Sequence, residues 1–233
     1  MDPIIRDVSF KSNDERLSGR TYQPPGGRSS KPGLLFVHGL HSNQEGYHVR
    51  ATAAATALDT VCLTFDLSGH GRSTGQLDNL TPRDHLTDLL AAYDNLVLQD
   101  NVDSARLGIC AASYGAYLTA LLVSLKPVKA LLLRAPALYS DDIVRMPIGR
   151  RRRSAPVAGP NAALTNIGQF RGRLLILESG NDELIPHSVV KAYVEAAHGN
   201  AHHQVIADAT HRLTDPVWQQ AFVDAIITWF RSL

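Results

Sequence analysis

The sequence has few cysteines, almost no net charge and no long apolar run, and each lack narrows the classes of protein it can belong to. Its two cysteines, Cys62 and Cys110, lie inside apolar runs. We expect buried free thiols there rather than a disulfide or a metal site. A net charge of +1 at pH 7 argues against a general electrostatic attraction to nucleic acid or to anionic membrane surfaces.

No apolar run approaches the roughly 18 residues that a membrane-spanning helix needs. The segment from Met1 to Phe10 also lacks the basic-then-apolar order of a secretory signal. We therefore expect a cytoplasmic protein in a reducing compartment, with neither a membrane nor nucleic acid as a partner. The hydrophobic fraction of 44% and the charged fraction of 19% are typical of a soluble globular chain.

Short apolar runs alternate with helical patterns along most of the chain. Continuous apolar runs are typical of strands in a parallel sheet, because helices cover both of its faces. The alternation predicts a doubly wound, mostly parallel α/β sheet in a single domain, residues 1–233, with a hairpin at its start. We expect strands at 4–12, 17–23, 34–37, 61–65, 106–110, 130–133, 174–177 and 203–206, and helices at 44–58, 81–98, 115–125, 188–197 and 215–230.

Two of these helices have clear start signals. Thr81 is a favourable N-cap, and Pro82 follows it at the first helical position. Asp215 and Pro216 occupy the same two places in the last helix. These pairs predict where both helices begin.

The connection at about 136–171 interrupts the alternation. It contains several prolines and glycines and a basic run, Arg150 to Arg153. A connection this long without clear strands is typical of a functional insertion, so we expect a cap or lid that sets substrate choice. The arginine run could favour acidic groups of a substrate, but a solvated surface run is the simpler interpretation.

The segment Ala111-Ala112-Ser113-Tyr114-Gly115 follows an apolar run and precedes a helical one. A nucleophile on such a tight strand-to-helix turn needs small residues two positions to either side, because the backbone is closely approached there. The usual pattern is Gly-x-Ser-x-Gly. Ala111 departs from it, but alanine is the next smallest residue. The alternative is an ordinary N-cap serine; we predict that Ser113 is the nucleophile.

Two further polar segments follow apolar runs. One contains Asp182 and the other His211. Ligands of open α/β sheets bind beyond the carboxyl ends of the strands, where a carboxylate on one loop can reach a histidine on the next. We predict His211 as general base and Asp182 as the acid that orients it, although each alone is an ordinary loop residue. The ranked alternatives for the acid are Glu178, Asp141 and Asp208.

A glycine turn follows the apolar run at 34–37, in the segment His38-Gly39-Leu40. Gly39 allows the chain to turn sharply, so that the N–H of Leu40, or that of His41, can point into the site. With the N–H of Tyr114, this predicts an oxyanion hole. The candidates for the pocket lining are His41, His48 and Tyr114.

The candidates fall in the order nucleophile, acid, histidine, which is the chain order of α/β-hydrolases and differs from that of other triad enzymes. The chain therefore resembles the α/β-hydrolase superfamily over nearly its whole length. The stretch from Asp66 to Ser73 is similar to the D-x-x-G-x-G-x-S loop of that superfamily, and we interpret it as a structural turn rather than a phosphate site. Length and insertion resemble small carboxylesterases, feruloyl-esterase-like enzymes and the dienelactone-hydrolase-like group.

The resemblance implies a serine hydrolase with Ser113, Asp182 and His211 as triad and the N–H groups of Leu40 and Tyr114 as oxyanion hole. We expect it to cleave a carboxylic ester of a small-molecule substrate through an acyl-enzyme, with no metal and no organic cofactor. The same triad also supports an amidase, peptidase, thioesterase or acyltransferase, because it does not choose the leaving group. The remaining alternative is a noncatalytic binding protein that kept the fold.

Overall fold

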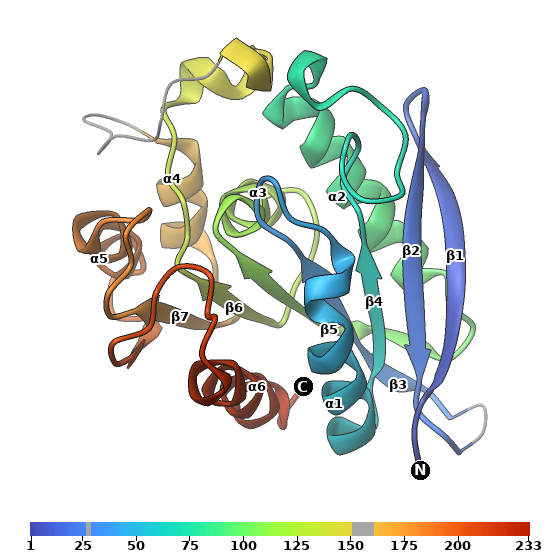
Figure 1. The fold of residues 1–233 in the computed structure, drawn as a ribbon. Coiled ribbons are helices and arrows are strands. Elements are labelled where there is room, and N and C mark those ends of the chain that lie inside the picture. Colours follow the sequence, from blue (N-terminus) through green and yellow to red (C-terminus); the bar gives the residue numbers. More distant parts are fainter. Residues whose placement is uncertain (27–28, 151–160) are drawn as a thin grey trace.

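The computed structural model describes residues 1–26, 29–150 and 161–233. An eight-stranded sheet forms its centre (Figure 1). Its strands are β1 (Ile4–Ser12), β2 (Glu15–Gln23), β3 (Lys31–Val37), β4 (Val61–Phe65), β5 (Val102–Ala112), β6 (Ala130–Arg134), β7 (Arg173–Ser179) and β8 (Ala201–Ile206). Their spatial order is β1-β2-β4-β3-β5-β6-β7-β8.

The sheet is mostly parallel. β1 pairs antiparallel with β2, and β2 pairs antiparallel with β4; from β4 to β8 every neighbouring pair is parallel. The chain leaves β3 to form β4 on one side and returns to form β5 on the other. The expected doubly wound, mostly parallel α/β fold is confirmed, and β3 marks the point at which the strand order reverses, where such sheets hold their ligands.

Helices cover both faces of the sheet, which is why every residue of β4 and β6 is buried. One face carries α1 (His48–Leu58) and α6 (Pro216–Phe230), which lie side by side in Figure 1. The other face carries α2 (Pro82–Val97), α3 (Tyr114–Leu122), α4 (Ala162–Gln169) and α5 (His187–Ala196), each in contact with the next.

Both predicted helix starts are confirmed. Thr81 caps α2 in a capping box, in which its hydroxyl accepts from the Asp84 amide while the Asp84 carboxylate accepts from the Thr81 amide. Asp215 caps α6 by accepting from the amide of Val217 at 2.7 Å. The boundaries of both helices therefore follow from local hydrogen bonding.

The observed elements differ from the predicted ones at several points. The first hairpin turns at Asn13 and Asp14 alone, because Ser12 pairs with Glu15 and Asn13 takes a positive φ of 49°. The expected helix at 44–58 begins with the 3₁₀ turn η1 (Gln44–Tyr47). Short 3₁₀ turns also occur at η2 (Leu77–Asn79), η3 (Asp141–Arg145) and η4 (Ile148–Arg150).

The connection at about 136–171 contains η3, η4 and the helix α4, which the sequence analysis did not predict. Asn161 caps α4 by accepting from the amide of Leu164 at 3.2 Å, so that a helix of only eight residues forms. Arg150 ends η4, whereas the rest of the basic run, Arg151 to Arg153, lies outside the described residues.

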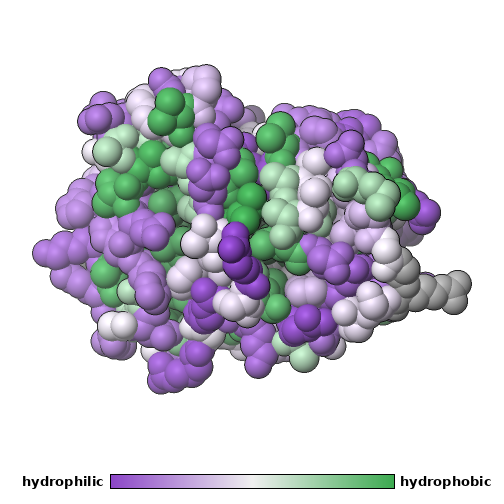
Figure 2. Space-filling model, turned by 90° about the horizontal axis from the view of Figure 1, so that it is seen from below, coloured by the Kyte–Doolittle hydropathy of each residue, from purple (hydrophilic) through white to green (hydrophobic). Residues whose placement is uncertain are grey.

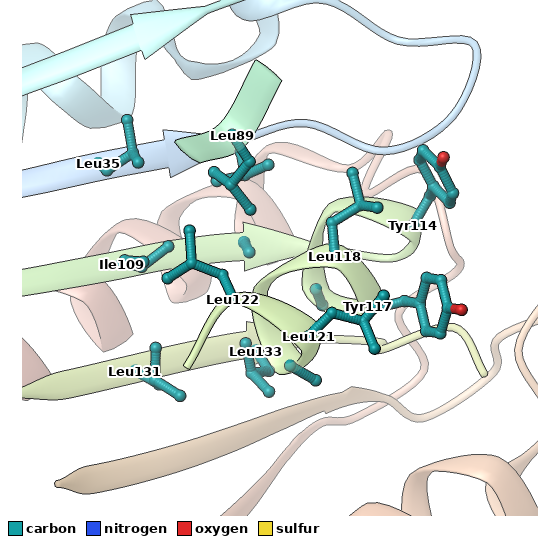
Figure 3. Packing of buried hydrophobic residues seen from close by; sticks show 14 of the residues in the cluster. Leu35, Leu89, Ile109, Tyr114, Tyr117, Leu118, Leu121, Leu122, Leu131 and Leu133 are labelled. Atoms are coloured by element: carbon teal, nitrogen blue, oxygen red, sulfur yellow. The ribbon is translucent and has the colours of Figure 1, made fainter. Parts of the chain in front are cut away.

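Two apolar cores lie on opposite faces of the sheet. In the larger, α3 packs on the central strands: Leu118, Leu121 and Leu122 lie over leucines of β3 and β6 and over Ile109 of β5 (Figure 3). The smaller lies under α1 and α6 and contains Cys62 and Cys110. α3 is buried along its whole length, so it holds the segment that precedes it rigidly against the sheet.

The two thiols are free and fully buried, as expected. Burial among apolar side chains raises the pKa of both, since a thiolate would be desolvated there. They act as small apolar residues of the core.

Among the described helices, none is both long and apolar enough to cross a membrane. Viewed from below, the surface carries separate hydrophobic patches between hydrophilic ones (Figure 2). Scattered apolar surface of this kind is ordinary for a folded chain.

Candidate active site

The site residues meet in a cavity of about 1320 Å³. Ser113, His211, Leu40 and His41 all line it, although they come from segments far apart in the sequence. Each follows the carboxyl end of a strand: Leu40 and His41 follow β3, Ser113 follows β5, and His211 follows β8. The reversal of strand order at β3 brings these ends together.

The backbone at Ser113 is strained, with φ of 53° and ψ of −118°. A non-glycine residue with positive φ costs about 1 to 3 kcal/mol and persists where surrounding contacts enforce it. Here the Ser113 amide donates to the carbonyl of Arg134 at 2.9 Å, and its own carbonyl accepts from the amide of Ala137 at 3.1 Å. The serine is thereby held at the end of β5 with its side chain in the cavity.

Small residues are required around this turn. A Cβ atom added to Gly115 would lie 2.5 Å from the carbonyl oxygen of His38 and 2.7 Å from that of Val37. A Cβ atom on Gly39 would lie 3.3 Å from that of Ser113. Ala111, by contrast, sits between Val37 and Leu133 in the sheet and is fully buried in the larger core, so its methyl group is accommodated.

His211 is held by Asp182. The Nδ1 atom of His211 lies 2.8 Å from one carboxylate oxygen of Asp182 and 3.1 Å from the other. The same carboxylate accepts from the amides of Leu184 and Ile185 at 2.9 and 2.8 Å. Burial acts to raise the pKa of Asp182, but these hydrogen bonds outweigh it and hold the pKa below its usual value. An ionised Asp182 fixes the Nδ1–H tautomer of His211 and leaves Nε2 as an acceptor.

The three alternative acids lie elsewhere. Glu178 bonds two other histidines, His187 at 2.7 Å and His203 at 2.8 Å. Asp141 accepts from the amide of Ala162. Asp208 lines a separate hollow between β8 and α6. Of the four acids considered, Asp182 is the one hydrogen-bonded to His211.

The turn after β3 contains the two amides that the sequence leaves open as oxyanion donors, those of Leu40 and His41. His41, with φ of 59°, donates its amide to Nε2 of His70 at 3.2 Å, and the amide of Ser42 donates to the Gly39 carbonyl at 3.2 Å. Two of the three amides after Gly39 are thus used inside the protein. Among the described residues, this leaves the Leu40 amide as the candidate oxyanion donor of the turn.

Three buried histidines support this turn: His38 contacts His70 and His70 contacts His85, with ring centres 5.0 and 5.4 Å apart and ring planes inclined at 57° and 61°. We call this row of tilted rings the histidine stack. The carbonyl of Ser68 accepts from Nδ1 of His70 and from Nε2 of His85, both at 3.0 Å. The remaining nitrogen of His85 lies 2.9 Å from the hydroxyl of Tyr114. His38 donates from Nδ1 to the Gly39 carbonyl at 2.8 Å and accepts from the Leu67 amide at Nε2 at 3.0 Å. Because each ring has one donating and one accepting nitrogen, these rings are neutral.

The electrostatics agree with neutral rings. Burial lowers the pKa of His38 to about 4 and that of His85 to about 3, and the neighbouring His70 lowers both further. Burial also lowers the pKa of His70. The stack therefore positions both sides of the site, the turn after β3 and the start of α3, without introducing charge.

The loop from Asp66 to Ser73 is a turn built around a buried carboxylate. Asp66 accepts from the amide of Gln44 at 2.7 Å and from that of Arg72 at 2.9 Å. A Cβ atom on Gly71 would lie 2.3 Å from the Asp66 carboxylate. The glycine is needed for this close approach, and the loop thereby fixes η1 beside the cavity.

Of the three predicted pocket residues, His41 lines the cavity, whereas His48 and Tyr114 are not among its described lining residues. The Nδ1 atom of His48 lies 3.2 Å from the hydroxyl of Tyr22, and the side chain of Tyr114 is buried against His85.

The sequence analysis missed other residues of the cavity. Arg50 and Arg134 do line the cavity, and so does Glu183, whose carboxylate accepts from the His211 amide at 3.0 Å. Arg134 could have been noticed as a charged residue that ends an apolar strand at the carboxyl edge of the sheet.

Comparison with known proteins identifies the family to which the sequence is similar. A family model described as serine aminopeptidase, S33, matches residues 28–160, which include Ser113 and the turn after β3. The chain is 26% identical over 226 residues to an uncharacterized protein of Mycobacterium tuberculosis. The aligned region covers 96% of this chain and 78% of that protein.

Two solved structures share the fold. An esterase of Pyrococcus furiosus superposes with a TM-score of 0.75 at 18% identity, covering 98% of this chain and 91% of the other. The ferulic acid complex of Est1E from Butyrivibrio proteoclasticus superposes with a TM-score of 0.76 at 18% identity, covering 95% and 96%. Asp182 and His211 lie beyond the residues matched by the family model, so their placement comes from the structure alone.

The turn at Ser113 predicts that Gly115→Ala is severely destabilising. The added methyl group would meet two backbone carbonyls that cannot move without shifting β3. We expect the free energy of unfolding to fall by about 3 kcal/mol. Gly46→Ala is the matched control, because its nearest neighbour is the Ser42 hydroxyl at 4.0 Å. Urea unfolding of both variants gives the comparison, and equal stability would contradict the packing described here.

The histidine stack predicts a loss of stability in acid. Unfolded histidine has a pKa of about 6.5, so between that value and about 3 the unfolded chain binds a proton that folded His85 does not. The free energy of unfolding should fall by about 1.4 kcal/mol per pH unit for each such ring.

Replacement by glutamine tests this. In His85→Gln, the side-chain amide can still donate to Ser68 and accept from Tyr114, but it does not titrate. Urea unfolding between about pH 7 and pH 5 should show a shallower slope than in the wild type, by a difference that approaches about one proton at pH 5. His198→Gln, at an exposed position, should leave the slope unchanged. Identical slopes in His85→Gln and the wild type would refute the neutral stack.

Proposed function

Because the chain belongs to the α/β-hydrolase family whose model is described as serine aminopeptidase, S33, we propose that it is a serine hydrolase that cleaves a carboxylic ester of a small molecule. One observation carries the proposal. Ser113, on a strained turn at the end of β5, lines the same cavity as His211, whose Nδ1 is held by Asp182 at 2.8 Å. Nucleophile, base and orienting acid are the three parts of an acyl-transfer site.

Acylation begins with proton transfer. The Nε2 atom of His211 takes the proton of the Ser113 hydroxyl as its oxygen attacks the ester carbonyl. Asp182 remains ionised and stabilises the imidazolium that forms. The imidazolium then returns the proton to the leaving alcohol, and an acyl-enzyme remains on Ser113. Water attacks this ester with His211 again as base, which releases the acid and restores the serine.

The amides of Leu40 and Tyr114 bind the oxyanion. Leu40 lies in the turn after β3, where the next two amides, those of His41 and Ser42, donate to groups within the protein. Tyr114 is the first residue of α3, so its amide lies at the positive end of the helix dipole. Each such donor typically supplies about 3 to 4 kcal/mol of transition-state stabilisation. The histidine stack behind both segments fixes them before substrate arrives.

The ester is favoured as substrate by the structural neighbours, since the Pyrococcus protein is an esterase and Est1E was solved with ferulic acid. The family description names an aminopeptidase, which makes an amide bond the second candidate. A panel of p-nitrophenyl esters, aminoacyl anilides and acyl-CoA thioesters separates these activities. Hydrolysis of the anilides alone would refute the esterase and indicate an amidase or peptidase.

Ser113→Ala should abolish hydrolysis of short p-nitrophenyl esters and labelling by a fluorophosphonate probe, while thermal unfolding stays near that of the wild type. The control is Ser42→Ala, a second serine of the same cavity, which should still be labelled. Labelling of Ser113→Ala at the wild-type level would refute the assignment of the nucleophile.

Asp182→Asn should lower kcat about 10⁴-fold, because an amide at this place favours the wrong tautomer of the histidine. Glu178→Gln is the matched control, since Glu178 bonds other histidines and not His211. Its kcat should remain close to that of the wild type in the same p-nitrophenyl ester assay. A large loss of kcat in Glu178→Gln together with a mild loss in Asp182→Asn would contradict Asp182 as the acid that orients His211.

A further inference from the structure

Of the three arginines that line the catalytic cavity, Arg212 is exposed at the surface, whereas Arg134 and Arg50 are buried and half-buried. The acyl-transfer steps use none of them. Arg134 ends β6, and Arg50 lies in the first turn of α1. Both line the cavity that holds Ser113 and His211. Arg134 is the sheet neighbour of Ala112, so it lies one strand away from the nucleophile.

Arg134 is a buried cation with few partners. Arg134 is 7% exposed, and one of its terminal nitrogens donates to the Ser179 hydroxyl at 3.1 Å. Its guanidinium carbon lies 5.7 Å from the centre of the Phe222 ring. A guanidinium has five N–H donors in a rigid fork, so among the described residues one bond to a neutral hydroxyl leaves most of its capacity unused. Burial lowers the pKa of Arg134, and the nearby Arg50 adds to this.

Arg50 lies against the same aromatic ring. Its guanidinium carbon is 4.9 Å from the ring centre of Phe222, and one terminal nitrogen donates to the Gly46 carbonyl. Its Nε atom is buried and, within the described part of the chain, has no hydrogen-bond partner. Two positive charges are therefore gathered around one ring on one side of the cavity.

No carboxylate of the described residues lies within 4.0 Å of either guanidinium. The stretches outside the description, 27–28 and 151–160, contain neither Asp nor Glu and cannot supply one. The charge of Asp182 does reach Arg134, but that carboxylate is already bound to His211 and to two amides.

The other acids of the cavity lie at its exposed rim and not beside the arginines. Glu45 is paired with Arg20 at 2.8 Å. Glu183 accepts from the amide of His211, and Asp78 is exposed to solvent. Water and salt screen such rim charges, whereas the buried cation is screened much less. The inner part of the cavity is therefore positive although the chain is nearly neutral.

From this arrangement we infer that the substrate carries a carboxylate, which Arg134 and Arg50 bind while its ester reaches Ser113. The inference rests on the proposed function and names the substrate class of that site. Burying an unpaired guanidinium is costly, and a bound anion offsets that cost. A carboxylate matches the parallel N–H pairs of arginine and forms strong charge-assisted hydrogen bonds. A free α-amino group, as in an aminopeptidase substrate, would be repelled at the same place.

Matched substrates test the inference. One pair is mono-p-nitrophenyl adipate and its terminal amide, which differ in charge on the acyl side. The other is 4-acetoxybenzoate and 4-acetoxybenzamide, which differ on the alcohol side. In the wild type we expect kcat/KM for the anion to exceed that for its neutral partner by about 10-fold or more in at least one pair.

Three variants locate the effect. Arg134→Met should bring the ratio to about 1, since methionine fills the space without the charge. Arg50→Gln, on a half-buried helical residue, should lower it and decides the matter if Arg134→Met does not fold. Arg212→Gln removes an exposed arginine of the same cavity and should leave the ratio unchanged. A wild-type ratio of about 1 or less in both pairs, or a ratio that survives both inner variants, overturns the inference.

A binding measurement separates this inference from the proposed function. Calorimetry on Ser113→Ala should detect adipate but not the neutral adipamide, and a further Arg134→Met substitution should abolish the signal. Adipate binding without hydrolysis of any ester would support the anion site and refute the hydrolase. Hydrolysis of neutral esters with no preference for anions would do the reverse. Adipamide bound as tightly as adipate, or neither bound in a protein that hydrolyses no ester, would overturn the anion site.

Discussion

The positive φ of Ser113 is the constraint on which the site depends. A serine adopts this backbone only where its neighbours enforce it. The enforcing contacts come from three directions: β6 accepts its amide, the segment after β6 donates to its carbonyl, and Gly115 lies against the carbonyls at the end of β3. The turn at Ser113 is thus held by contacts from three strands. The buried helix α3 packs behind it and prevents its backbone from relaxing.

The second half of the site is held by a different means. The turn after β3 is held by hydrogen bonds that pass through neutral imidazole rings to the Ser68 carbonyl and the Tyr114 hydroxyl. A buried polar network of this kind is rigid because every member is satisfied. It also keeps positive charge away from the place where Leu40 and Tyr114 would receive an oxyanion.

The sequence predicted what local patterns control. The apolar runs placed the strands to within a few residues, because each run needs burial on both faces of a parallel sheet. Thr81 and Asp215 marked two helix starts through hydrogen bonds within a single turn. Asp182 and His211 could be paired because both follow neighbouring strands at one edge of the sheet.

What the sequence could not predict depends on contacts between distant segments. The His41 amide is occupied by His70, which comes from another loop. The position of Arg134 beside the nucleophile depends on the register of β5 and β6, and that of His48 on the direction of a helix face. The helix α4 is too short for its periodicity to stand out from a segment rich in proline and glycine.

The two buried thiols can report on transient opening of the smaller core. Cys62 and Cys110 lie in strands β4 and β5, beneath α1 and α6, and they are the only cysteines of the chain. A thiol reagent can modify them only when this part of the sheet is transiently exposed, so the modification rate reads out the opening equilibrium of the core. For the same reason, a cysteine introduced at the surface could be labelled alone in the native protein, which permits spectroscopic probes to be attached without removing either native thiol.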